Sequence, residues 1–121
     1  MLLRRVAHVN LSVDDVDAAR AFYGELLGLE AAPRPADTPR AGCWFALGEV
    51  ELHISLEQGA DNARSKRHVA FEVSDLAALR ARLAAAGVSI DGGSPMAGVE
   101  RFFARDPAGN RLEFYIRTGA A

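Results

Sequence analysis

HVNLSV (residues 8–13) and HVAFEV (residues 68–73) decide how the rest of this chain is interpreted, and their first residues lie 60 positions apart. Each opens with a histidine and then places valine, leucine or phenylalanine at every second position. Successive side chains of a β-strand point to opposite faces, so each stretch predicts a strand with one apolar face and one face that carries the histidine. Asp15 and Asp75 follow as predicted N-caps of helices.

The match between the two stretches extends into the segments that follow them. Helical apolar stripes are predicted after each strand, and Gly28 and Gly87 are predicted to end the helices. The stripes consist of Val16, Ala19, Tyr23 and Leu26 in the first half, and of Leu76, Leu79, Leu83 and Ala86 in the second. Further strands are predicted at 29–32, 42–47, 50–57, 88–90, 101–105 and 111–116. Each half therefore reads strand, helix, strand, strand, strand.

This repeat predicts an α+β fold of two tandem βαβββ modules whose mixed sheets curve around a trough. Module one covers about 4–57, a flexible polar linker about 58–66, and module two about 67–117, all within a single domain of 121 residues. A small sheet with a helix on only one face is marginal alone. The two sheets should therefore pair within one chain or by exchange in a homodimer.

Composition excludes several classes of protein. The formal net charge is −2, which provides no basic field for nucleic acid. No apolar run approaches the roughly 20 residues of a membrane helix, and a cytoplasmic location is expected. The single cysteine, Cys43, has no intramolecular disulfide partner and is interpreted as a small buried apolar residue.

The three histidines of the chain all fall on the predicted polar strand faces. His8 corresponds to His68 in the repeat, and His53 corresponds to Glu113 at the same offset. Together they form a set of three imidazoles and one carboxylate, which suits divalent zinc, nickel, cobalt, manganese or iron(II). Taken singly, each histidine would be read as an ordinary exposed or hydrogen-bonded polar residue.

The two strand openings, LLGL at 26–29 and RFFARDPAGNRLEFYI at 101–116 resemble the vicinal oxygen chelate superfamily over nearly the whole chain. That group includes glyoxalase I, fosfomycin-resistance thiol transferases, methylmalonyl-CoA epimerase, extradiol dioxygenases and bleomycin-resistance proteins. The resemblance implies that His8, His53, His68 and Glu113 are the metal ligands. It also implies a substrate that chelates the metal through two vicinal oxygens.

The leading hypothesis is a divalent-metal-dependent glyoxalase-like lyase or isomerase that acts on a small molecule. Glu113 is the predicted catalytic base, and Glu51 and Glu72 are reserve candidates. One member of each pair Trp44/Phe45 and Phe102/Phe103 should face the trough, and the alternation alone does not say which. The predicted substrate contacts are Asn10, Ser12, Trp44, Phe103, Arg111 and Tyr115.

Two other functions fit the same residues. An extradiol-type dioxygenase would use His8, His68 and Glu113 as a facial triad on iron(II). A drug-sequestering protein of the bleomycin-resistance kind would need an apolar trough and no metal. The sequence leaves open the substrate, the native metal, and whether a site is built from one chain or two.

Overall fold

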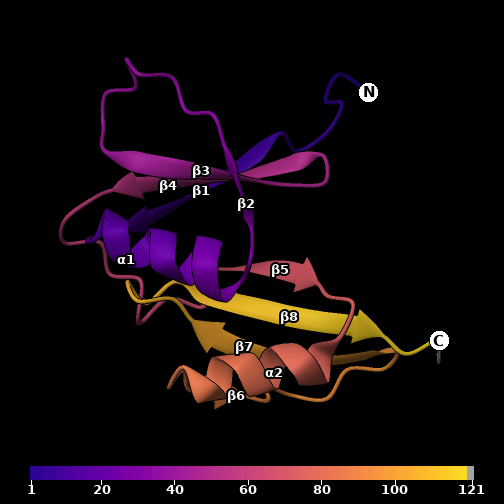
Figure 1. The fold of residues 1–121 in the computed structure, drawn as a ribbon. Coiled ribbons are helices and arrows are strands. Elements are labelled where there is room, and N and C mark those ends of the chain that lie inside the picture. The colour runs from indigo at the N-terminus through magenta and orange to yellow at the C-terminus, as the bar shows by residue number, and fades with distance from the viewer. Residues whose placement is uncertain (120–121) are drawn as a thin grey trace. The chain divides into compact units, whose positions relative to one another are not determined.

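The computed structural model describes residues 1–119 and divides the chain into two compact units, Met1–Ala60 and Asp61–Ala121 (Figure 1). Both units have the predicted order of elements, so the tandem βαβββ fold of the α+β class is confirmed. The first contains β1 (His8–Val13), α1 (Val16–Arg20), the π-helix η1 (Ala21–Leu26), β2 (Glu30–Ala32), β3 (Gly42–Leu47) and β4 (Val50–Leu56). The second contains β5 (His68–Glu72), α2 (Leu76–Ala85), β6 (Ile90–Asp91), β7 (Val99–Arg105) and β8 (Arg111–Arg117). No helix among the described residues is long and apolar enough to span a membrane.

Both sheets are mixed and have the same topology. Their strand orders are β1-β4-β3-β2 and β5-β8-β7-β6, and the first strand of each unit pairs in parallel with the last. The other pairs are antiparallel, and the predicted two-residue turn at Gly48 and Glu49 joins β3 to β4. Each unit thus places its first strand at one edge of the sheet, directly beside its last strand.

The apolar core of the first unit lies on the face that α1 and η1 cover (Figure 1). Val9, Leu52 and Phe45 are direct partners across three neighbouring strands, so their side chains share that face. The ring of Phe45 lies 6.2 Å from the ring of Tyr23, which is fully buried. Trp44 therefore points to the opposite face, which resolves the first aromatic pair.

The first helix differs from the single stripe that its sequence predicts. α1 ends at Arg20 and continues as the π-helix η1, in which the amide of Leu27 donates to the carbonyl of Phe22 at 2.9 Å. A π-turn holds more residues than an α-turn, so the positions that face the core no longer follow the α-helical spacing. As a result Phe22 and Tyr23 are both buried, whereas Leu26, a member of the predicted stripe, is only half-buried.

The core of the second unit is built from phenylalanines. The ring of Phe114 lies 5.5 Å from Phe71 and 5.3 Å from Phe102, which places Phe102 in the core and Phe103 on the opposite face. Leu76 and Leu83 of α2 are buried. The predicted caps are present in both units, since Asp15 and Asp75 each accept from the third amide beyond them.

The segment interpreted as a flexible linker is partly ordered by the β7–β8 loop. Asn62 is buried and donates to the carbonyl of Ala108 at 3.2 Å, and Arg105 donates to the carbonyls of Asn62 and Ser65. The loop is itself closed by Asp106, whose carboxylate accepts from two loop amides. The DPAGN motif is therefore a structural turn that contacts part of the predicted linker, and the second unit begins at Asp61.

Replacement of Gly42 tests the pairing of β3 with β4. A Cβ atom at Gly42 would overlap the backbone carbonyl of Ile54, whereas nothing lies within 4 Å of a Cβ at Gly92. We expect Gly42→Ala to lower the free energy of unfolding by about 1–3 kcal/mol, because backbone must shift to admit the methyl group. Gly92→Ala should change it by less than about 0.5 kcal/mol. Equal urea midpoints for the two variants would contradict the described register.

A second test concerns Cys43, which is 8% exposed. Burial raises the pKa of this thiol, against the opposing charges of Arg20 and Arg34. The folded chain therefore holds the thiol proton at a pH where the unfolded chain, with a thiol pKa of about 8.5, releases it. We expect the free energy of unfolding to fall as pH rises above that value. The variant Cys43→Ala should lack this part of the pH dependence. Rapid reaction of the native thiol with Ellman's reagent would contradict the burial.

Candidate functional site

The polar face of the first sheet holds a stack of three aromatic rings. Asn10 and Trp44 are both strand partners of His53, so all three lie on the face away from the helix. The ring of His53 lies 3.8 Å from that of Trp44, with the planes 1° apart, and 4.0 Å from that of His8, with the planes 15° apart. His53 is therefore fixed between its two neighbours, and we call His8, His53 and Trp44 the imidazole stack.

Glu51 orients the imidazole of His53. Its Oε1 lies 2.9 Å from Nε2 of His53, whose side chain is 10% exposed. A carboxylate accepts the hydrogen of a neutral imidazole, so Nε2 carries the proton and Nδ1 keeps the lone pair that a ligand or a metal ion would use. The first unit thus places a carboxylate behind one of the predicted metal ligands.

The second unit brings His68 and Glu113 together. Nδ1 of His68 lies 2.9 Å from the carbonyl oxygen of Lys66, and Nε2 lies 3.1 Å from Oε1 of Glu113. Because a carbonyl only accepts, Nδ1 donates to it, and the lone pair of a neutral imidazole is then left on Nε2, facing the carboxylate. Two acceptors in contact require a proton or a cation between them.

This arrangement in the second unit fits a metal ion. Adjacent ligands of an octahedral ion, each about 2.1 Å from the metal, lie roughly 3 Å apart, close to the measured separation between His68 and Glu113. A backbone carbonyl on the other ring nitrogen is also the usual support of a metal-binding histidine. The separation fits two neighbouring ligands of one ion, and it equally fits a protonated imidazole paired with the carboxylate.

Two arginines surround Phe103 beside this pair. The ring of Phe103 meets that of His68 edge-on at 5.5 Å, and the guanidinium of Arg111 lies over it at 3.7 Å. The guanidinium of Arg101 lies 5.2 Å from the same ring, and its Nη1 is 3.6 Å from Oε1 of Glu113. Sequence reasoning missed Arg101, although its place two residues before Phe103 in a strand puts both on one face.

Strand pairing makes Phe103 the structural counterpart of Trp44. Trp44 is the partner of His53, and Phe103 is the partner of Glu113. The positions differ by 59 between β3 and β7 but by 60 between β4 and β8, because nine residues separate Phe103 from Glu113 and eight separate Trp44 from His53. Each half-site therefore has an aromatic ring against its histidine.

Asn10 and Ser12, which were predicted to contact substrate, are bonded to neighbours on β4 and just beyond it. The hydroxyl of Ser55 donates to Oδ1 of Asn10 at 2.7 Å, and the hydroxyl of Ser12 donates to Glu57. Both residues lie on the same face as the imidazole stack. Contact of either residue with a substrate stays a prediction.

Glu72, a reserve candidate for the base, lies outside the His68–Glu113 pair. Its carboxylate is 3.6 Å from Nε of Arg117, and both side chains are more than half exposed. The guanidinium of Arg117 also lies 5.7 Å from the ring of Tyr115, another predicted substrate contact. Glu72 is therefore an exposed ion-pair partner in this structure.

The four predicted ligands come as two pairs, His8 with His53 in one unit and His68 with Glu113 in the other. Within residues 1–119, no group of three or more histidine, cysteine, aspartate or glutamate side chains is placed to hold a metal ion. Binding of one ion by all four residues stays a prediction.

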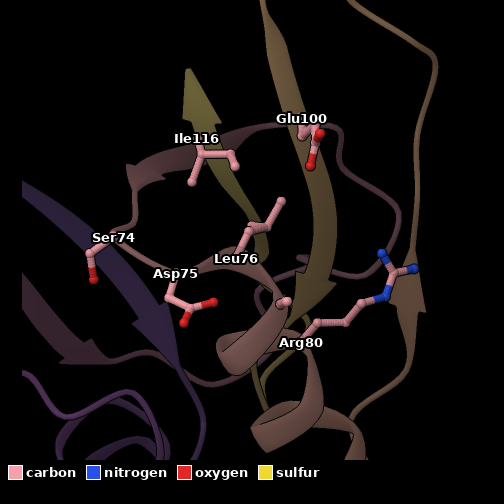
Figure 2. Close-up of a pocket in the computed structure, with 7 residues that line it drawn as sticks. Ser74, Asp75, Leu76, Arg80, Glu100 and Ile116 are labelled. Atoms are coloured by element: carbon pink, nitrogen blue, oxygen red, sulfur yellow. The ribbon is translucent and has the colours of Figure 1, made fainter. Parts of the chain in front are cut away.

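A cavity of about 320 Å³ lies elsewhere in the second unit, at the start of α2 (Figure 2). Figure 2 shows Leu76 and Ile116 beside the charged side chains of Asp75, Arg80 and Glu100. None of the residues predicted to bind metal or substrate lines it. Asp75 already caps the helix at this point, because its carboxylate accepts from the amide of Ala78 at 3.0 Å.

Comparison with known proteins finds relatives of this chain both by sequence and by structure. The chain is 29% identical over 126 residues to the glutathione transferase FosA of Serratia marcescens, covering 99% of this chain and 86% of that protein. It is 32% identical over 111 residues to the ethylmalonyl-CoA/methylmalonyl-CoA epimerase of Cereibacter sphaeroides, covering 80% and 82%. A crystal structure of a glyoxalase family protein from Bacillus anthracis superposes with a TM-score of 0.88 at 34% identity, covering 98% of each chain.

The family comparison covers both units. The sequence model of the Glyoxalase/Bleomycin resistance protein/Dioxygenase superfamily matches residues 5–114, a range that includes both histidine-bearing strands and Glu113. The two tandem βαβββ units, each with a histidine at the start of a first strand that pairs with its last strand, agree with these matches. The chain therefore belongs to the Glyoxalase/Bleomycin resistance protein/Dioxygenase superfamily.

Proposed function

We propose that this protein is a divalent-metal-dependent enzyme of the glyoxalase type, a lyase or isomerase acting on a small molecule with two vicinal oxygens. The observation that carries the proposal is the contact between His68 and Glu113, with the second ring nitrogen of His68 held by the carbonyl of Lys66. Membership of the superfamily, with an epimerase and a glutathione transferase among the relatives, supports an enzymatic role. We further expect a cytoplasmic homodimer.

His8, His53, His68 and Glu113 are the proposed metal ligands. The bound ion would act as a Lewis acid that polarises the two substrate oxygens and stabilises developing negative charge. Glu51 supports this role on the first unit, because its bond to Nε2 of His53 leaves Nδ1 for coordination. Trp44 restrains the same ring from one side, so His53 is already oriented before any ligand binds.

Glu113 is the proposed general base. Its Oε1 would accept a proton from the carbon next to a substrate carbonyl and later return it. The positively charged Arg101 forms an ion pair with this carboxylate at 3.6 Å, and His68 contacts the same oxygen. The relative of Cereibacter sphaeroides is an epimerase, and inversion at a carbon centre by proton removal and return needs a base of this kind.

Metal binding can be read directly from the fluorescence of Trp44, the only tryptophan of the chain. Chelator-treated protein titrated with Ni²⁺ or Co²⁺ should bind one ion per chain and lose Trp44 emission, because Trp44 stacks on His53 at 3.8 Å. Glu113→Gln should weaken the affinity measured by calorimetry by at least about tenfold. Glu72→Gln, which removes an exposed carboxylate from the neighbouring strand, is the matched control and should bind normally. Failure to bind any of these ions stoichiometrically would refute the proposed function.

The role of Glu113 as base is tested by catalysis. We expect isomerisation of the hemithioacetal formed from methylglyoxal and glutathione, or deuterium exchange next to a carbonyl in heavy water. Glu113→Gln should reduce the rate by roughly 10²–10⁴-fold, the usual contribution of a positioned base. Glu72→Gln should keep the wild-type rate. Oxygen uptake by iron-loaded protein, without proton exchange, would instead favour the dioxygenase function.

A further inference from the structure

The polar face of the second sheet carries four arginines against three carboxylates, namely Arg101, Arg105, Arg111 and Arg117 against Glu72, Asp91 and Glu113. Arg101 and Arg111 both lie over the ring of Phe103, and Glu113 is the one carboxylate paired with either of them among the described residues. Nη1 of Arg101 is 3.6 Å from Glu113, and Nη2 donates to the carbonyl of Ser94 at 3.0 Å. Arg101 thus uses its charge in the ion pair with Glu113, and no carboxylate is paired with Arg111 among the described residues.

Arg111 is oriented but has no polar partner. Its guanidinium stacks 3.7 Å from the centre of Phe103, and within residues 1–119 it forms neither an ion pair nor a side-chain hydrogen bond. Stacking on an aromatic face fixes the plane of a guanidinium and leaves its N–H edge open. An open N–H edge of this kind matches an oxyanion, which accepts two parallel hydrogen bonds from it.

An arginine at this strand position occurs in only one of the two pseudo-symmetric units. Arg111 is the strand partner of His68, whereas the strand partner of His8 is Glu51. Glu51 is occupied by His53, so the first unit offers a carboxylate at the position where the second offers a cation. A negatively charged group is therefore favoured on the second unit, beside the His68–Glu113 pair.

We infer that Arg111 binds an oxyanion, a carboxylate, phosphate or phosphonate, of the substrate whose neighbouring oxygens are handled by the His68–Glu113 pair. The inference rests on the proposed function only for the statement that the oxyanion belongs to the substrate. Binding of an oxyanion by Arg111 itself requires no metal. Phe103 supplies the surface that holds the guanidinium, and Arg101 keeps Glu113 from competing for Arg111.

The test titrates the full chain with inorganic phosphate and, separately, with acetate, and measures binding by calorimetry with and without prior chelator treatment. Wild-type protein should bind at least one probe in both states, and the probe that binds more tightly identifies the oxyanion class. Arg111→Gln should weaken that binding at least about tenfold, whereas Arg111→Lys, which keeps the charge but not the planar fork, should weaken it less. Arg117→Gln is the control, because this arginine lies on the same strand and over a ring but already has Glu72 as partner.

The outcomes separate the inference from the proposed function. Binding to metal-free protein that Arg111→Gln abolishes supports the inference even if the chain binds no metal. Binding that disappears on metal removal and is indifferent to Arg111→Gln overturns it, as does binding by neither probe. Urea unfolding of each variant checks the fold, and equal loss of binding in Arg117→Gln would show a general charge effect and also overturn the inference.

Discussion

In each module the first strand pairs in parallel with the fourth, with His8 opposite Glu51 and His68 opposite Arg111. The register of these pairs decides the face of every side chain in the sheet, because a shift by one residue would exchange the apolar and polar faces. The helices cover the apolar faces, and the polar faces keep the histidines. Strand pairing is therefore what places His53 against His8, and Glu113 against His68.

The two polar faces are built to one plan but differ in charge. The first has two imidazoles and a tryptophan, with Glu51 behind His53. The second replaces one imidazole by Glu113 and surrounds it with arginine. A duplicated scaffold can thus carry two different side-chain sets, since one face holds stacked aromatic and imidazole rings and the other combines a carboxylate with arginines.

Several features followed from local sequence, and several did not. Alternation in β1 and β5, the caps Asp15 and Asp75 and the Gly48–Glu49 turn depend on neighbouring residues, and the structure has all of them. The π-helix does not follow from the period of the apolar residues, because burial of adjacent Phe22 and Tyr23 is a tertiary demand. The hydrogen bonds from Arg105 to the carbonyls of Asn62 and Ser65 likewise join residues some 40 positions apart.

The sequence by itself determined the repeat, the tandem βαβββ order and the histidines and glutamate of the candidate site, since all of these are set by spacing along the chain. Only the tertiary structure decided that Trp44 and Phe103 face the polar side, that Glu51 supports His53 and that Arg101 holds Glu113. These contacts join different strands, and their partners depend on loop lengths and sheet register. Periodicity within a single strand carries no information about either.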